Sequence, residues 1–166
     1  MKRNENSKKV VLICGSSRGI GFFIGKKFLE NGNIVVFSSR FISKKAHQFV
    51  KLFIKYKNQI FIKRCDFSKK NSINNLKEKI IKKFKRLDIL VTNSGMSSGN
   101  LNLPLKYNEI DHSINQNFKT CLFPIEVFLK NLIRSRGNVV AISSIAGIEH
   151  ISAPISYSAS KSAVNT

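Results

Sequence analysis

The stretch Lys9–Gly21, KVVLICGSSRGIG, constrains the fold most, because it joins a buried strand to a glycine-rich loop. The aliphatic run Val10–Ile13 is too short for a buried helix and suits a parallel strand that is covered on both faces. Gly15 allows a tight turn, Gly19 lets a phosphate approach the backbone, and Gly21 lets the next helix pack closely on the strand. The N-terminus of that helix favours a pyrophosphate, although the spacing Gly-x-x-x-Gly-x-Gly alone fits a plain glycine-rich turn equally well.

Apolar periodicity predicts that strands and helices alternate along the rest of the chain. Such alternation is typical of an α/β fold, a doubly wound parallel sheet with helices on both faces, here formed by residues 1–166 as one domain. In the first helix we expect Phe23, Ile24, Phe28 and Leu29 to face inward. The expected elements are strands over residues 10–13, 34–37, 59–63, 88–92 and 138–142, helices over 20–31 (closed by Gly32), 43–56, 68–86 (capped by Ser68) and 107–135, an irregular segment over 93–106, and a final helix.

Small or polar residues follow every expected strand. They are Gly15, Ser38–Arg40, Cys65–Asp66, Asn93 and Ser143–Ser144. In a doubly wound sheet the ligand lies beyond the carboxyl ends of the strands, beside the first strand. The sequence therefore predicts a binding cleft at this end of the sheet.

Composition narrows the function classes. The net charge of +20 suggests a nucleic-acid partner, but the lysines are scattered along the chain, and the densest cluster, Lys79–Arg86, has the pattern of a solvated helix face. We therefore expect no nucleic-acid partner. No apolar run is long enough to span a membrane, and no signal peptide opens the chain, so a cytoplasmic protein is expected. Cys14, Cys65 and Cys121 lack metal-site spacing and are expected to be reduced and buried, without a metal.

The segment ISSIAGIEHISAPISYSASK carries Ser144, Tyr157 and Lys161. The i, i+4 spacing places the tyrosine and the lysine on one face of the final helix, where an isolated pair of this kind is most often a plain exposed pair. Together with the glycine loop and the segment Thr92–Gly95, however, this pattern resembles the classical short-chain dehydrogenase/reductase family. The resemblance covers nearly the whole chain and implies a Rossmann-like NAD(P)-binding domain.

The resemblance implies four catalytic residues. Tyr157 is the general acid and base, Lys161 also binds the nicotinamide ribose, Ser144 polarises the substrate carbonyl, and Asn117 holds a water in the proton relay. Ser143 competes with Ser144, and Asn115 with Asn117, and the family's spacing favours Ser144 and Asn117. The chemistry agrees, because a ketone that accepts a hydride needs a proton, and an ammonium beside a phenol, whose free pKa is about 10, favours the phenolate.

The end of the second strand bears on the choice of cofactor. An NAD-selective site carries a carboxylate there, but no acid occurs between Glu30 and Asp66. Arg40, helped by Arg18 and Ser39, would instead pair with a 2′-phosphate, so NADP(H) is favoured, while NAD(H) stays possible.

By resemblance, Asp66 and Phe67 contact the adenine and Asn93 lies beside its ribose. The full set of residues expected to bind the cofactor is Gly15, Ser17, Arg18, Gly19, Ile20, Gly21, Ser39, Arg40, Asp66, Phe67, Asn93, Ser94, Gly95, Tyr157 and Lys161.

Members of this family usually continue beyond the position of Thr166 with further strands and the cover of the substrate pocket. We therefore expect a domain truncated after the fifth strand and the start of the next helix, poorly soluble and inactive alone, whose full-length form is a homodimer or homotetramer. The expected activity is the reduction of a carbonyl to an alcohol, or the reverse. The substrate stays open among acyl-carrier-protein thioesters, sugars and other carbonyls, and the alternative is a dinucleotide-binding protein without catalysis.

Overall fold

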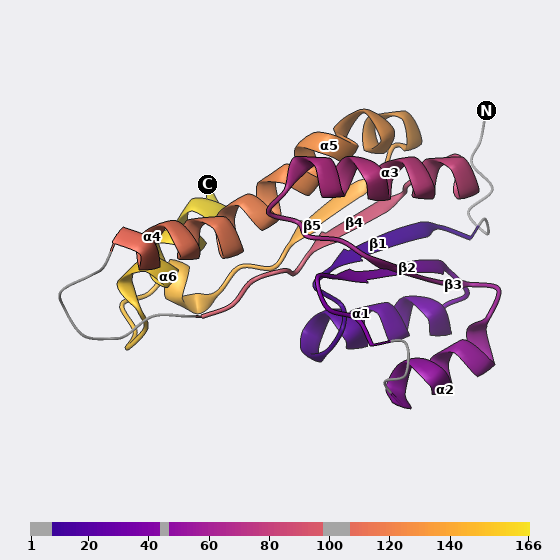
Figure 1. The fold of residues 1–166 in the computed structure, drawn as a ribbon, viewed down its shortest axis with the longest axis horizontal. Coiled ribbons are helices and arrows are strands. Elements are labelled where there is room, and N and C mark those ends of the chain that lie inside the picture. Colours follow the sequence, from indigo (N-terminus) through magenta and orange to yellow (C-terminus); the bar gives the residue numbers. More distant parts are fainter. Residues whose placement is uncertain (1–7, 44–46, 98–106) are drawn as a thin grey trace.

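A computed structural model describes residues 8–43, 47–97 and 107–166, and its centre is a five-stranded parallel sheet (Figure 1). The strand order is β3-β2-β1-β4-β5, so the first strand lies in the middle and the chain moves outward from it in both directions. This arrangement confirms the predicted doubly wound sheet. The strands are β1 (Val10–Cys14), β2 (Ile34–Ser39), β3 (Ile60–Arg64), β4 (Ile89–Thr92) and β5 (Asn138–Ala141).

Helices cover both faces of the sheet, as predicted (Figure 1). One face packs on α1 (Gly19–Glu30) and α2 (His47–Tyr56), and the other on α3 (Lys70–Phe84) and α5 (Thr120–Ser135). Side chains alternate along β1, because Val11 and Ile13 join the core under α1 and α2, whereas Leu12 joins the core under α3 and α5. Both faces of the central strands are therefore buried, which explains their unbroken aliphatic sequences.

The single helix predicted over residues 107–135 is wrong in one respect, because a π-helical turn interrupts it. The chain forms α4 (Tyr107–Ser113), then the π-helical turn η1 (Ile114–Lys119), and only then α5. The last helix, α6 (Ile155–Asn165), packs against α4 and η1, where the Ser113 and Ser160 hydroxyls lie 2.9 Å apart. Most of the irregular segment expected after β4, residues 98–106, lies outside the described residues.

Local predictions about helices α1 and α3 have mixed outcomes. Gly32 ends α1 as predicted, with φ +79° and its N–H donating to Leu29 O. Phe23 does not face inward but is 64% exposed. Ser68 does not cap α3, because its hydroxyl donates to Asp66 Oδ1 at 2.7 Å and Lys69 is the N-cap residue.

The outer strand β5 is the least covered strand of the sheet. Val139 and Val140 are 41% and 46% exposed, whereas the strands inside the sheet are buried. The three cysteines are free and buried, as predicted. Within the described residues, no helix is long and apolar enough to cross a membrane, and no group of three acidic, histidine or cysteine residues could hold a metal ion.

The contact between α1 and β2 gives a test of this packing. A Cβ on Gly25 would lie 2.4 Å from the ring of Phe37, which is fully buried and packed edge-on against Phe49. We expect Gly25→Ala to lower the free energy of unfolding by about 1–3 kcal/mol because the ring cannot move away, although alanine favours helix over glycine by about 1 kcal/mol. Urea unfolding measures this, with the exposed Lys27→Ala as control, and a Gly25→Ala chain more stable than wild type contradicts the packing.

Candidate active site

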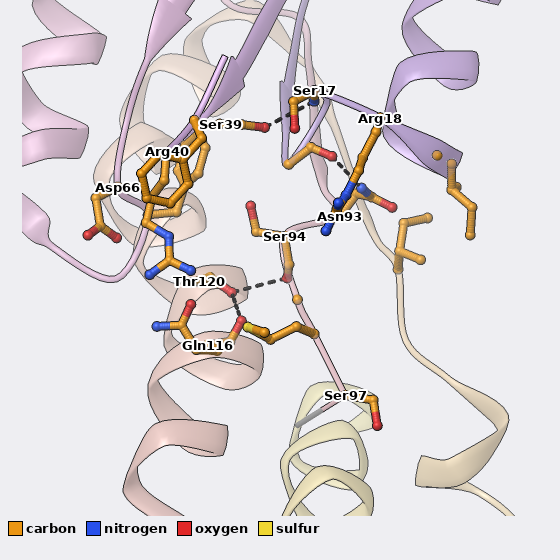
Figure 2. Close-up of a pocket in the computed structure, with 18 of the residues that line it drawn as sticks. Ser17, Arg18, Ser39, Arg40, Asp66, Asn93, Ser94, Ser97, Gln116 and Thr120 are labelled. Carbon is orange, nitrogen blue, oxygen red and sulfur yellow. Dashed lines mark hydrogen bonds between the residues drawn. The ribbon is translucent and has the colours of Figure 1, made fainter. Parts of the chain in front are cut away.

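A cleft of about 790 Å³ lies at the carboxyl ends of the strands, where the sequence predicted it (Figure 2). Its walls come from the loops after all five strands and from η1, α5 and α6. The structure brings every residue expected to bind the cofactor to this cleft except Gly21, which is buried behind the loop. The residues that line it are Gly15, Ser17, Arg18, Gly19, Ile20, Ser39, Arg40, Phe41, Asp66, Phe67, Asn93, Ser94, Gly95, Met96, Ser97, Gln116, Thr120, Ile142, Ser143, Tyr157 and Lys161.

Two of the loop glycines are required by close contacts. A Cβ on Gly15 would lie 2.8 Å from Ser94 Cα, and one on Gly21 would lie 2.5 Å from Gly15 O and 2.6 Å from Asn93 Nδ2. At Gly19 nothing lies within 4 Å of the Cβ position. Glycine is favoured there because the backbone φ is +58°, which side chains with a Cβ rarely adopt. Residue Arg18, the N-cap of α1, makes no side-chain cap hydrogen bond. The first N–H groups of α1 are thus open toward the cleft, an arrangement that suits a pyrophosphate.

Ser16 fixes the glycine loop to the end of β2. Its hydroxyl donates to Ile13 O at 2.9 Å and accepts from Ser38 N–H at 2.7 Å, and its own N–H donates to Ser38 O. Next to it, Ser17 N–H donates to Ser39 Oγ at 3.1 Å. The glycine loop and the end of β2 are therefore bonded together as one wall of the cleft. Sequence reasoning missed Ser16, because one serine among several in a loop carries no distinguishing pattern.

Charged groups gather where β2 and β3 end. Figure 2 shows Arg40 beside Asp66, and the Arg40 guanidinium lies 5.8 Å from the centre of the Phe41 ring. Partial burial acts to raise the pKa of Asp66, but hydrogen bonds from Ser68 and the charges of Arg40 and Lys69 outweigh it and lower the pKa. Asp66 is therefore ionised near neutral pH, and it lines the cleft together with the Arg40 guanidinium.

The loop after β4 is held by a backbone carbonyl of the glycine loop and by side chains of η1 and α5. Asn93 Nδ2 donates to Gly15 O at 2.8 Å, and Asn117 Oδ1 accepts from Met96 N–H at 2.9 Å. Thr120 Oγ1 lies 3.1 Å from Ser94 O. Asn117 is 1% exposed, its amide also donates to Ser113 O at 3.0 Å, and its side chain does not line the cleft. Asn117 thus positions the loop in this structure, and its expected role in a proton relay stays a prediction.

Tyr157 and Lys161 line the cleft from α6, one helical turn apart. The Lys161 ammonium donates to Ile142 O at 2.9 Å and is 3.4 Å from the Cβ position of Gly95. Lys161 is only 5% exposed, and this burial lowers its pKa. A buried ammonium that lines the cleft is a fixed hydrogen-bond donor and positive charge, one helical turn from Tyr157 along α6.

The two adjacent serines after β5 face different surroundings. Ser143 lines the cleft, and its hydroxyl donates to Lys161 O at 3.2 Å. Ser144 is the N-cap of the short helix η2 (Ile145–Gly147), and its hydroxyl accepts from Ala146 N–H at 3.2 Å. The choice of Ser144 over Ser143 as the residue that polarises a substrate therefore stays a prediction that rests on spacing.

Several residues of the cleft were not predicted from the sequence. Phe41 lines the cleft and is exposed. Its position directly after Arg40, beyond the second strand, was the signal in the sequence that could have identified it. Gln116 and Thr120 reach the cleft because the π-helical turn rotates this part of the helix, and no sequence pattern signals that turn. Met96 and Ser97 belong to the irregular segment expected over residues 93–106, and Ile142 was expected as the last residue of the fifth strand but follows β5 in the structure.

Comparison with known proteins identifies relatives along almost the whole chain. The family model described as short chain dehydrogenase matches residues 9–166. A 3-oxoacyl-[acyl-carrier-protein] reductase FabG of Rickettsia typhi is 34% identical over 155 residues, covering 92% of this chain and 61% of that protein. The FabG of Buchnera aphidicola subsp. Baizongia pistaciae is 28% identical, covering 95% of this chain and 63% of that protein. This chain thus spans somewhat less than two-thirds of the length of these relatives.

Solved structures agree with the fold. The structure titled ElxO with NADP bound superposes with a TM-score of 0.87 at 34% identity, covering 95% of this chain and 64% of that one.

Two buried serines at the glycine loop form a matched pair for a test. Ser16 and Ser38 are both fully buried, but the Ser16 hydroxyl makes the bonds described above, whereas Ser38 Oγ has no hydrogen-bond partner among the described residues. We expect Ser16→Ala to lower the free energy of unfolding by about 1–3 kcal/mol, and Ser38→Ala to leave it within about 0.5 kcal/mol of wild type or to raise it. Equal losses for both variants in urea unfolding contradict the anchoring role of Ser16.

Proposed function

The chain belongs to the short-chain dehydrogenase family of oxidoreductases, and from this we propose that its protein transfers a hydride between NADP(H) and a carbonyl or secondary alcohol. The observation that carries the proposal is that Tyr157 and Lys161 line the same cleft as the glycine loop and the open N-terminus of α1. A proton donor and a phosphate cradle thus share one cavity, as a dinucleotide-dependent reductase requires.

The side chains of the cleft suit the two ends of a nicotinamide dinucleotide. Gly15, Gly19 and the first turn of α1 would hold the pyrophosphate, and the Lys161 ammonium would donate to the nicotinamide ribose. When bound, the cofactor supplies the hydride. Tyr157 Oη would give its proton to the oxygen of the reduced carbonyl, and would remove that proton in the reverse direction. The positive charge of Lys161 stabilises the phenolate that remains on Tyr157.

The charges at the end of β2 support NADP(H) over NAD(H). Arg40 lines the cleft, Ser39 precedes it, and Arg18 lies in the glycine loop. A guanidinium forms paired, charge-assisted hydrogen bonds with a phosphate, which only NADP(H) carries at the adenine ribose. Asp66 is the only acid that lines the cleft among the described residues, and it lies after β3 rather than after β2, where a ribose-binding carboxylate would stand.

For the substrate we propose a 3-oxoacyl thioester, because the relatives from Rickettsia typhi and Buchnera aphidicola are named 3-oxoacyl-[acyl-carrier-protein] reductases. Subunit association is proposed through α5, whose outer face exposes Leu122, Leu129 and Ile133 at helical spacing. The alternative function is a dinucleotide-binding protein without catalysis, and the retained Tyr157 and Lys161 argue against it.

Cofactor selectivity tests the assignment of Arg40. We expect Arg40→Asp to weaken NADPH binding by about 10- to 100-fold through loss of the phosphate contact, while NADH binding changes little. Isothermal titration calorimetry with each cofactor measures this in the protein that carries these residues. The matched control is Arg64→Asp, because Arg64 lies against the same Phe41 ring at 5.8 Å but does not line the cleft. The same NADPH loss in both variants points to general charge and overturns the phosphate contact.

Catalysis is tested at the phenol. We expect Tyr157→Phe to reduce NADPH oxidation with a 3-oxoacyl thioester by about 100-fold or more while the affinity for NADPH stays near wild type, because only the proton donor is removed. The assay uses the protein that carries these residues and follows NADPH oxidation by the absorbance of the reduced nicotinamide. Wild-type protein that binds NADPH but turns over no carbonyl substrate supports the non-catalytic alternative.

A further inference from the structure

A second cavity, of about 650 Å³, lies at the opposite edge of the molecule from β5 and is separate from the cleft. Its lining residues come mainly from β3, α2 and the end of α3. Figure 1 shows β3 at the edge of the sheet, with α2 on one face and α3 on the other. We call this cavity the β3 groove. It is lined by Ile34, Phe49, Val50, Phe53, Ile54, Lys57, Asn58, Gln59, Ile60, Phe61, Ile62, Lys63, Lys83 and Phe84.

The backbone along this groove has a free hydrogen-bonding edge. Val35 N–H donates to Gln59 O and Cys65 N–H donates to Ser39 O, so residues 59, 61, 63 and 65 bond to β2. In a parallel ladder the alternate residues Ile60, Ile62 and Arg64 then direct their N–H and C=O groups outward. Among the described residues, β3 pairs with no strand other than β2. An extended chain could add to the sheet here.

The walls of the β3 groove are apolar and unusually exposed. On α2, Val50, Phe53 and Ile54 are 42%, 51% and 75% exposed. Across the strand edge, the Phe84 ring of α3 packs edge-on against Phe61 with the ring centres 5.6 Å apart. The side chains of a strand point alternately to the two faces of a sheet. Apolar walls on both sides of the β3 edge can therefore contact an added strand on both of its faces.

The rim of the β3 groove is cationic. Lys57, Lys63 and Lys83 line it, none of them forms an ion pair among the described residues, and no acidic residue lines the groove. The ammonium groups of Lys63 and Lys83 lie 4.9 and 5.7 Å from the centre of the Phe61 ring, so both stand over the edge strand. An occupant of this groove is therefore expected to carry carboxylates beside apolar side chains.

We propose that the β3 groove binds an extended segment of a partner protein in which acidic and apolar residues alternate, added as a sixth strand beside β3. The free edge selects an extended backbone, the walls select apolar side chains, and the three lysines select carboxylates. A second copy of this chain fits less well, because two grooves would bring the same lysines face to face on chains of net charge +20. An acyl chain would leave the outward N–H and C=O groups without partners.

The test uses a fluorescein-labelled ten-residue peptide of alternating glutamate and valine, and measures fluorescence anisotropy with the protein that carries these residues. The comparison peptide alternates lysine and valine. We expect the acidic peptide to bind at least about tenfold more tightly, with an affinity that falls as salt is added. Saturating NADPH should not displace it, and Arg40→Asp should leave its binding unchanged, which separates this site from the cofactor cleft.

Two substitutions locate the site. Ile62→Pro removes an outward N–H without breaking the ladder to β2, and should abolish binding, whereas Ile62→Val should retain it. Lys83→Glu should weaken binding by about three- to tenfold, while Lys79→Glu, an exposed residue of α3 outside the groove, should not. Circular dichroism verifies that Ile62→Pro is folded, and Lys83→Glu provides the test if it is not.

Several results overturn the proposal. They are equal binding of the two peptides, displacement of the acidic peptide by NADPH, and unchanged binding in both Ile62→Pro and Lys83→Glu. Self-association of the chain in analytical ultracentrifugation that Ile62→Pro abolishes identifies a second copy as the occupant and also overturns it. None of these results depends on whether Tyr157 and Lys161 catalyse a reaction.

Discussion

The structure depends on one close approach, at the point where β1 ends, α1 begins and β4 ends. Gly21 lies so near Gly15 and Asn93 that any Cβ there would stand 2.5 Å from Gly15 O, and the Asn93 amide donates to that same oxygen. Because this contact fixes the start of α1 against two neighbouring strands, it also fixes the direction of the open helix N-terminus. The binding cleft therefore follows from the packing of the sheet and needs no separate element.

The sequence predicted the sheet well because buried parallel strands have a strong signature. Val10–Ile13 and Ile34–Phe37 are aliphatic or aromatic runs that only a strand covered on both faces explains, and the structure places all of them in the sheet. The carboxyl-end cleft followed from the polar residues after each strand. Phe23 was misassigned because apolar spacing gives the buried face of a helix and not the width of that face.

Other features could not be predicted because they depend on tertiary contacts. The π-helical turn at Ile114–Lys119 has no known sequence pattern, yet it buries Asn117 and brings Gln116 to the cleft. Ser16 and Ser38 look alike in the sequence, but only the first has partners for its hydroxyl among the described residues. Spacing alone separated Ser143 from Ser144, while their hydroxyl contacts depend on how η2 and α6 pack.

The excess of positive charge has a physical meaning once the acids are located. Asp88 is buried and accepts from the backbone of β1, Asp66 lies in the cleft at the carboxyl ends of the strands, and Glu30 and Glu126 pair with lysines at the surface. No acid lines the β3 groove, and Asp66 is the only acid that lines the cleft among the described residues, so both proposed ligands are anionic. Salt weakens binding at both sites, and only geometry separates them: a helix N-terminus with a guanidinium selects phosphates, whereas a free strand edge selects a peptide.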